Sequence, residues 1–148
     1  MKPRHDMINH GVNIVCAEHD GVRGGLAVAW ATQVAVNEVL VCIGAQSHTR
    51  DLILASGAFG VSVLAQEHLE MARAFGGRHS RNLDKFADVA THTGETGSPL
   101  LDACALTLDC RVIAVHDQGS HKLIVGKVVA AERRLECYQP LIYRQEDY

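Results

Sequence analysis

One stretch of alternating residues constrains the fold of this chain more than any other feature. Between residues 104 and 114, Cys, Leu, Val and Ala occupy the even positions, while Thr107, Asp109 and Arg111 lie between them. This period of two belongs to a β-strand, in which successive side chains point to opposite faces of the sheet. The pattern predicts a long strand with one apolar face and one face in water.

The flanking sequence supplies further strands. They are predicted at residues 8–17, 26–36, 39–43, 58–64, 121–132 and 141–143. The first three are expected to form an antiparallel meander, because Asp20-Gly21 and Asn37-Glu38 are turn signals. The turn at residues 117–120 would return the chain into the strand at 121–132, where Gly126 marks a bulge or a close backbone approach.

Two short helices are predicted between the strands. The segment after Ser47 has helical spacing, with Thr49 as a candidate N-cap and Gly57 placed where a helix C-terminus favours positive φ. A second apolar stripe predicts a helix at residues 67–75, and residues 78–85 are polar enough to form a loop.

The number of strands and the chain length together predict a barrel. A chain of 148 residues with 47% hydrophobic content can bury one core but not two, so residues 1–148 are expected to form a single domain. Six or seven apolar strands would expose sheet edges unless the sheet closes on itself. We therefore expect a mainly β, closed or nearly closed Greek-key barrel with a few short inserted helices.

Charge and cysteine usage exclude several functional classes. The chain has 14 basic and 17 acidic residues, a balance that argues against a nucleic-acid groove or a membrane surface. No apolar run approaches the roughly 18 residues that span a bilayer, so a soluble, cytoplasmic protein is expected. The five cysteines form no CxxC pair and the nine histidines lack metal-ligand spacing, so neither a disulfide framework nor a metal site is expected.

The start of the first helix is a candidate anion site. Unpaired backbone N–H groups and the helix dipole favour an anion there, and Ser47, Thr49 and Arg50 add hydroxyl and guanidinium donors. This set of donors suits a phosphate group. The alternative is that Thr49 only caps its own helix and that Arg50 is solvated.

Two further residues are candidates for contact with a ligand. Trp30 lies between Ala29 and Ala31, whose small side chains would let a flat ring approach the backbone; alternatively, Trp30 anchors the core or a dimer interface. His121 follows a Gly-Ser turn at the start of a strand, where it would project from the rim of a barrel. The alternative is a surface histidine with no function.

The order of these segments resembles the flavin reductase-like family of FMN-binding split barrels. The likeness runs from about residue 11 to residue 143. It rests on the segments at residues 28–33, 47–53, 56–64, 74–77, 84–86, 93–101 and 119–128.

The resemblance implies a homodimer of split β-barrels with one FMN per subunit near the dimer interface. Residues of the Trp30 segment would lie along the flavin ring and ribityl chain, and those at the helix start would take the phosphate. The implied cofactor-binding residues are Ala29, Trp30, Ala31, Thr32, Gln33, Ser47, His48, Thr49, Arg50, Ser80, Lys85 and Tyr143. His121 would be the catalytic residue, placed near the flavin and the nicotinamide pocket.

The implied activity is electron transfer from NADH or NADPH, through flavin, to free flavin, an iron centre or a partner protein. The flavin performs the redox chemistry and the protein supplies binding, orientation and charge. Ser120 stands where the family usually has an acidic residue, and Ala29-Trp30 replaces paired serines. These differences resemble the flavoredoxin-like branch, so an FMN electron-transfer protein without nicotinamide activity stays open. A third alternative is a barrel that binds no flavin.

Overall fold

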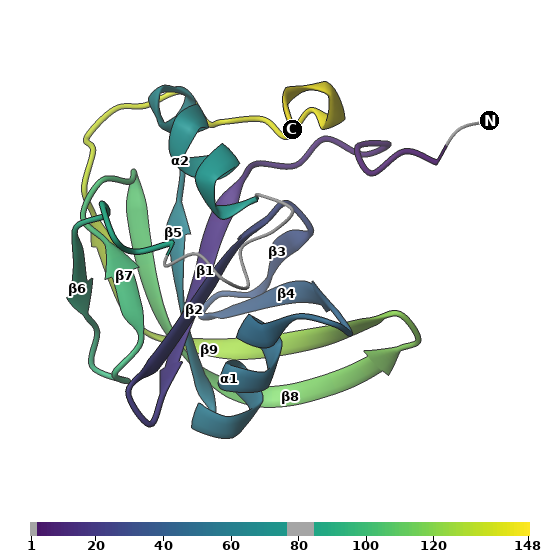
Figure 1. Ribbon diagram of the computed structural model, residues 1–148, viewed down its shortest axis with the longest axis vertical. Coiled ribbons are helices and arrows are strands. Elements are labelled where there is room, and N and C mark those ends of the chain that lie inside the picture. Colours follow the sequence, from purple (N-terminus) through teal and green to yellow (C-terminus); the bar gives the residue numbers. More distant parts are fainter. Residues whose placement is uncertain (1–2, 77–84) are drawn as a thin grey trace.

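The computed structural model describes residues 3–76 and 85–148, and most of its strands belong to one antiparallel sheet (Figure 1). In chain order, the elements are β1 (Asn13–His19), β2 (Val22–Val28), β3 (Ala31–Ala35), β4 (Glu38–Gly44), α1 (His48–Ser56), β5 (Ala58–Val63), the 3-10 turn η1 (Gln66–His68), α2 (Leu69–Phe75), β6 (Thr91–Thr93), β7 (Pro99–Leu101), β8 (Leu106–Gln118), β9 (His121–Arg133) and the 3-10 turn η3 (Gln145–Asp147). The sheet has seven strands in the order β2-β1-β5-β8-β9-β4-β3, and β6 pairs with β7.

The seven-stranded sheet curls around one apolar core. Val15 of β1, Val41 of β4 and Ile124 of β9 are all buried in the same cluster, although their strands are spread across the sheet. Ile53 of α1 lies in this cluster too, so α1 packs against the barrel. The predicted mainly β barrel with six or seven antiparallel strands and short helices is confirmed.

A second apolar cluster lies between the barrel and α2. It contains Ile14 and Cys16 of β1, together with Phe75 of α2 and Leu141 of the C-terminal segment. Because neighbouring residues of β1 point to opposite faces, Ile14 and Val15 serve different cores. This burial on both faces explains why β1 reads as a continuous apolar run.

The predicted meander of the first three strands is confirmed in its two antiparallel pairings and wrong in its continuous middle strand. β1 pairs with β2 across Asp20-Gly21, and β3 pairs with β4 across Asn37-Glu38. The segment at residues 26–36 is broken at Ala29-Trp30 into the end of β2 and the start of β3, which lie at opposite ends of the sheet order. The chain crosses between the two edges of a curled sheet at this break, and strand propensity alone does not identify such a crossing.

The polar side of β8 is buried in its first half, contrary to the predicted water-facing surface. Thr107 and Asp109 are each 2% exposed. The Asp109 carboxylate accepts hydrogen bonds from the Thr96 backbone N–H at 3.0 Å and from the Thr96 hydroxyl at 2.5 Å. Thr96 belongs to the connection between β6 and β7. This connection covers the polar side of the first half of β8.

The remaining sequence predictions are confirmed with small changes. Helix α1 is capped by Ser47, whose hydroxyl accepts from the Arg50 backbone N–H at 3.2 Å, so the Thr49 cap is wrong; Gly57 ends the helix at φ +72°. The predicted close approach at Gly126 is real, since a Cβ there would lie 2.5 Å from the Phe59 ring. The strand expected at residues 141–143 is reduced to isolated bridges such as Gly11 with Ile142.

The sequence predicts a helix at residues 67–75 and a loop at residues 78–85. Residues 67–75 form η1 followed by α2, which ends at Gly76. The loop predicted at residues 78–85 lies outside the described residues except for Lys85. Within residues 3–76 and 85–148, no helix is long and apolar enough to cross a lipid bilayer.

Candidate functional site

Trp30, His121 and the start of α1 lie at one end of the barrel. The Trp30 carbonyl accepts from the Cys42 N–H at 2.9 Å, which places the β2–β3 break beside β4. Two residues further along β4, Gly44 pairs with His121 of β9. The next residue, Ala45, donates its N–H to the Ser120 carbonyl at 2.9 Å, and Ser47 then caps α1. Strand β4 and the residues that follow it therefore connect Trp30, His121 and the start of α1 through backbone hydrogen bonds.

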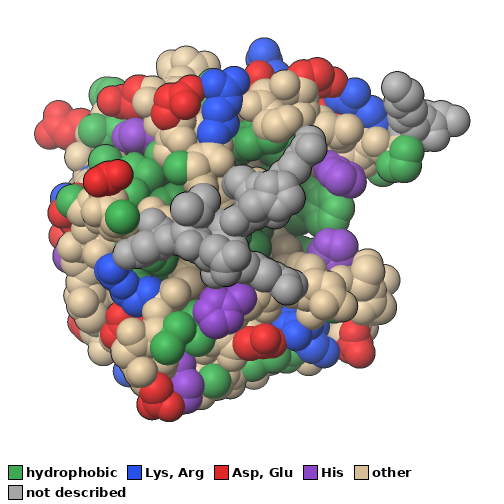
Figure 2. Space-filling view, in the orientation of Figure 1, with side chains coloured by type: hydrophobic (Ala, Val, Ile, Leu, Met, Phe, Trp, Pro, Cys, Tyr) green, Lys and Arg blue, Asp and Glu red, His purple; other side chains and the backbone are tan. Residues whose placement is uncertain are grey.

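The Trp30 indole contacts two imidazole rings. The His121 ring centroid is 5.2 Å from that of Trp30, with the planes tilted by 46°. The His5 ring meets Trp30 at 5.9 Å and 87°, an edge-on contact. Figure 2 shows a notch at the right of the molecule with histidine side chains at its upper and lower edges and hydrophobic surface between them. Such a cluster offers an apolar plane flanked by hydrogen-bond donors.

The His121 ring is held by its neighbour in sequence. The Ser120 hydroxyl lies 2.9 Å from His121 Nδ1, within hydrogen-bonding distance. A hydrogen bond at one ring nitrogen orients the ring and leaves the other nitrogen for a ligand. Nε2 is therefore the atom of His121 that is placed to act on a bound molecule.

The start of α1 contains a guanidinium N–H donor that has no acceptor in the described part of the chain. Arg50 Nη2 donates to Asp51 at 2.8 Å, whereas the buried Nε of the same side chain has no hydrogen-bond partner among the described residues. The first N–H groups of a helix also lack acceptors within the helix. A buried N–H of a charged group that lacks an acceptor is costly, and a phosphate oxygen would satisfy it.

Thr49 takes a different position from Ser47 and Arg50. Its side chain is 4% exposed, and a Cβ on Gly24 of β2 would lie 3.0 Å from its hydroxyl oxygen. Thr49 therefore packs between α1 and β2. His48 is exposed at the first position of the helix. The side chains of Ser47, His48 and Arg50 remain the candidate donors to an anion.

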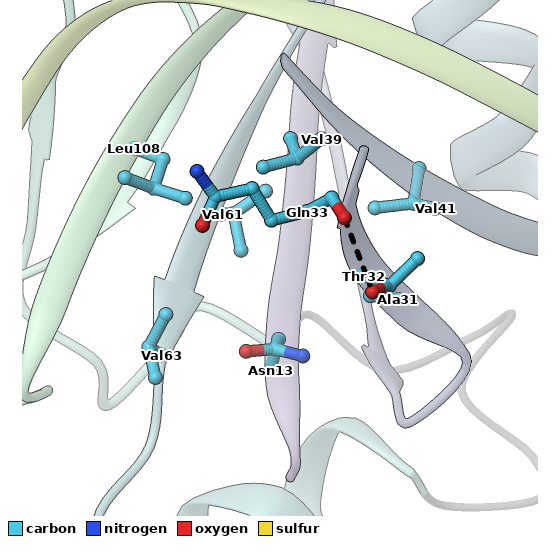
Figure 3. A pocket seen from close by; sticks show the side chains of 9 residues that line it. All are labelled: Asn13, Ala31, Thr32, Gln33, Val39, Val41, Val61, Val63 and Leu108. Carbon is cyan, nitrogen blue, oxygen red and sulfur yellow. Dashed lines mark hydrogen bonds between the residues drawn. The ribbon is translucent and has the colours of Figure 1, made fainter. Parts of the chain in front are cut away.

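The strand β3 lines a cavity of about 190 Å³ together with residues of β1, β4, β5 and β8 (Figure 3). Its lining residues are Asn13, Ala31, Thr32, Gln33, Val39, Val41, Val61, Val63 and Leu108. Figure 3 shows the Gln33 side chain extending from β3 towards Val61 and Leu108. The cavity is mostly apolar, with three polar side chains at its wall.

The contacts of Lys85 and Tyr143 are with residues other than Trp30 and His121. Lys85 Nζ donates to the carbonyls of Gly25 at 3.0 Å and Phe75 at 2.9 Å, and burial lowers the pKa of this amine. Tyr143 packs on the second core cluster and stacks on Tyr148 at 5.3 Å; burial raises the pKa of its phenol. Ser80 lies outside the described residues.

Cys16, Cys42 and Cys110, which lie on strands of the barrel, are poor nucleophiles. Burial raises the pKa of the Cys16 and Cys110 thiols to about 12, and burial also raises the pKa of Cys42, next to Trp30 in the sheet. Because the thiolate is the reactive form, these side chains act as small apolar groups at neutral pH.

Sequence reasoning missed His5 as a member of the cluster. Its carbonyl accepts the Trp30 Nε1–H at 3.0 Å, in addition to the ring contact. A backbone carbonyl carries no sequence signal, because every residue type has one. No pattern in the sequence could have placed the N-terminal segment here.

Comparisons with known proteins agree with this geometry. A family model described as "Flavin reductase like domain" matches residues 5–148. A ferric-chelate reductase (NAD(P)H) of Archaeoglobus fulgidus is 36% identical over 129 residues, covering 84% of this chain and 76% of the relative. The reductase subunit of a flavin-dependent monooxygenase of Mycobacterium tuberculosis is 31% identical over 141 residues, with coverage of 93% and 74%. An FMN-binding protein of Thermus thermophilus shares the fold with a TM-score of 0.90 at 20% identity, covering 100% of this chain and 89% of the other.

Proposed function

The chain belongs to the flavin reductase like family, and we propose that it holds FMN at the Trp30 end of the barrel and oxidises NADH or NADPH. It is a flavin reductase-like oxidoreductase. The observation that carries the proposed site is the buried Arg50 Nε at the start of α1, which has no hydrogen-bond partner among residues 3–76 and 85–148. Strand β4 links this helix start to Trp30, through the Cys42 N–H, and to His121, through the pairing with Gly44. An anion site next to an aromatic plane suits a phosphorylated ring system.

The residues present fit FMN. Ser47, His48 and Arg50 would hold the phosphate, since they lie at the start of α1 and the buried Arg50 Nε has no partner among the described residues. Trp30 would support the ring system, and the small side chains of Ala29 and Ala31 let it approach the backbone. When bound, the flavin supplies the redox chemistry, accepting hydride from a reduced nicotinamide and passing electrons to an acceptor.

The role proposed for His121 is electrostatic. Its Nε2 can donate a hydrogen bond to a group that carries or develops negative charge, while Ser120 holds Nδ1 at 2.9 Å. A fixed donor needs no reorganisation when charge develops nearby. The positioned ring therefore orients a substrate amide or stabilises negative charge at the site.

The names of the relatives support the donor and acceptor classes. The Archaeoglobus relative is named for NAD(P)H and a ferric chelate, and the Mycobacterium relative is named as the reductase subunit of a monooxygenase. For this chain, a nicotinamide donor and a flavin, iron or redox-protein acceptor are proposals. The cytoplasmic location also stays a prediction. A single domain over residues 1–148 is proposed from the extent of the family match.

A homodimer is supported by exposed apolar side chains on β8, β9 and β3. Ile113 and Val115 of β8 are 52% and 41% exposed, and Val129 of β9 is 37% exposed. Two more exposed valines, Val34 and Val36, lie at and just beyond β3. Exposed apolar groups on neighbouring strands are typical of a contact surface between subunits.

The visible spectrum under anaerobic conditions tests the proposed activity. Purified protein mixed with FMN is expected to lose its yellow absorbance when NADH or NADPH is added. A sample that keeps its colour with both nicotinamides but bleaches with dithionite would contradict the nicotinamide activity and favour the electron carrier. Protein that gains no visible absorbance from FMN would favour the barrel without flavin.

A further inference from the structure

The two ends of the chain run side by side next to the candidate site (Figure 1). Val12 donates its N–H to the Leu141 carbonyl at 2.9 Å, and Tyr143 donates to the His10 carbonyl at 2.8 Å. Beyond these contacts, the N-terminal segment continues to His5, which lies against Trp30. The C-terminal segment continues into η3. Both ends therefore reach the same edge of the barrel.

Four residues join the two ends, and we call them the terminal clasp: Arg4, Asp6, Gln145 and Glu146. Asp6 accepts from the Gln145 backbone N–H at 3.0 Å, and the Gln145 side chain accepts from the His5 N–H at 2.7 Å. Arg4 pairs with Asp6 at 2.9 Å and with Glu146 at 2.7 Å. The Asp6 side chain is only 12% exposed within these contacts.

His5 connects the terminal clasp to Trp30. Its N–H is bound by Gln145, and its carbonyl accepts the indole N–H of Trp30 at 3.0 Å. Its ring also packs edge-on against the indole. The polar atom of Trp30 is thereby fixed by His5, and the indole ring contacts both His5 and His121.

We infer that His5 is a positioning residue of the flavin site, which fixes the Trp30 indole and is itself held in place by the C-terminal turn through the terminal clasp. The inference rests on the proposed function, because it gives Trp30 the role of a support for the ring system. A ring held before binding loses less conformational entropy when the ligand arrives. The clasp therefore raises the affinity for flavin without touching it.

The clasp is suited to this local role because it contributes little to the rest of the fold. Arg4 and Glu146 side chains are 41% and 64% exposed, and exposed ion pairs add little to global stability. The hydrogen bond from the Gln145 N–H, then the contact with Arg4, lowers the pKa of Asp6. The carboxylate is thus charged at neutral pH, and the clasp loosens only when acid protonates it.

The test uses the fluorescence of Trp30, which is the single tryptophan of the chain. The double variant Asp6→Ala/Gln145→Ala removes the clasp contacts to His5 without changing any ring at the site. In the protein without flavin, we expect its Trp30 emission to shift to longer wavelength and to become more accessible to acrylamide. Because hydrogen bonds are lost, we expect FMN to bind about three- to tenfold more weakly.

Glu132→Ala is the matched control, because it breaks an exposed ion pair with Arg134 elsewhere on the surface. It should match the parent protein in emission, acrylamide quenching and FMN affinity. Parent-like emission and quenching in the double variant would overturn the inference. A changed emission with parent-like FMN affinity would also overturn it, since the positioning would then not serve binding. If the parent protein itself binds no FMN, the proposed function fails, while the emission still reports whether the clasp positions Trp30.

Discussion

At the residue scale, the candidate site depends on a few groups whose neighbours fix their orientation. Ser120 holds one nitrogen of His121, Ser47 caps the helix that presents Arg50, and His5 holds the indole of Trp30. The sequence was sufficient to single out Trp30, His121 and Arg50 because their residue types and local context have chemical meaning. It could not identify His5, which acts partly through its backbone carbonyl.

Replacing Arg50 tests the phosphate site. Arg50→Ala should weaken FMN binding about ten- to hundredfold, because a charge-assisted hydrogen bond to the phosphate is lost. Equilibrium titration with FMN measures the change, and Arg133→Ala, which removes an exposed guanidinium at the end of β9, is the control. Equal affinities of the two variants would argue against a phosphate at α1.

Replacing Ser120 tests the orientation of His121. Ser120→Ala removes the hydroxyl 2.9 Å from Nδ1 and lets the ring and its tautomer vary. We expect kcat/KM for NADH or NADPH to fall by up to about tenfold, with a smaller change in FMN affinity. Steady-state kinetics and an FMN titration on the same sample separate the two quantities. A parent-like kcat/KM would show that Ser120 does not control His121.

At the element scale, β8 shows what a strand pattern can and cannot reveal. Alternation placed β8 and β9 and their turn correctly, because period and turn chemistry are local properties. It failed on the polar face at Thr107 and Asp109, since a second layer formed by the β6–β7 connection covers them. The sequence pattern does not distinguish a buried carboxylate that accepts hydrogen bonds from a carboxylate exposed to solvent.

The covered face gives a stability prediction. Asp109→Ala would leave the Thr96 N–H without its acceptor and should lower the free energy of unfolding by about 1–3 kcal/mol. For a chain of this size, the melting temperature should fall by roughly 3–10 °C. Thermal unfolding followed by circular dichroism measures it, with Asp117→Ala in the exposed β8 end as the control. A parent-like melting temperature would show that the hydrogen bonds from Thr96 to Asp109 do not stabilise the fold.

At the scale of the whole molecule, the curled sheet brings distant segments into one site. Trp30 lies where the chain crosses from one edge of the sheet to the other, and both chain ends meet beside it. Strand propensities and turn signals predicted a barrel and the β1–β2 and β3–β4 pairings, but not this crossing, because the separation of β2 from β3 depends on how the complete sheet closes. The resemblance of the segment order supplied the family, which local patterns alone would not have identified.

The exposed apolar residues of the long hairpin give a prediction for the assembly. Val115→Glu adds a charge to a side chain that is 41% exposed and should convert the proposed dimer into a monomer. Light scattering after size exclusion measures the mass. The control is Lys127→Glu, a change to an exposed charged position of β9. A parent protein that is monomeric at all concentrations would remove the basis for the dimer.

One end of the barrel is proposed to bind a flavin through both its ring and its phosphate. The most direct measurement is quenching of Trp30 emission by FMN compared with riboflavin, which has the same ring system but no phosphate. We predict that both quench the emission and that FMN binds at least about tenfold more tightly. Equal affinities, or no quenching by either compound, would contradict the claim.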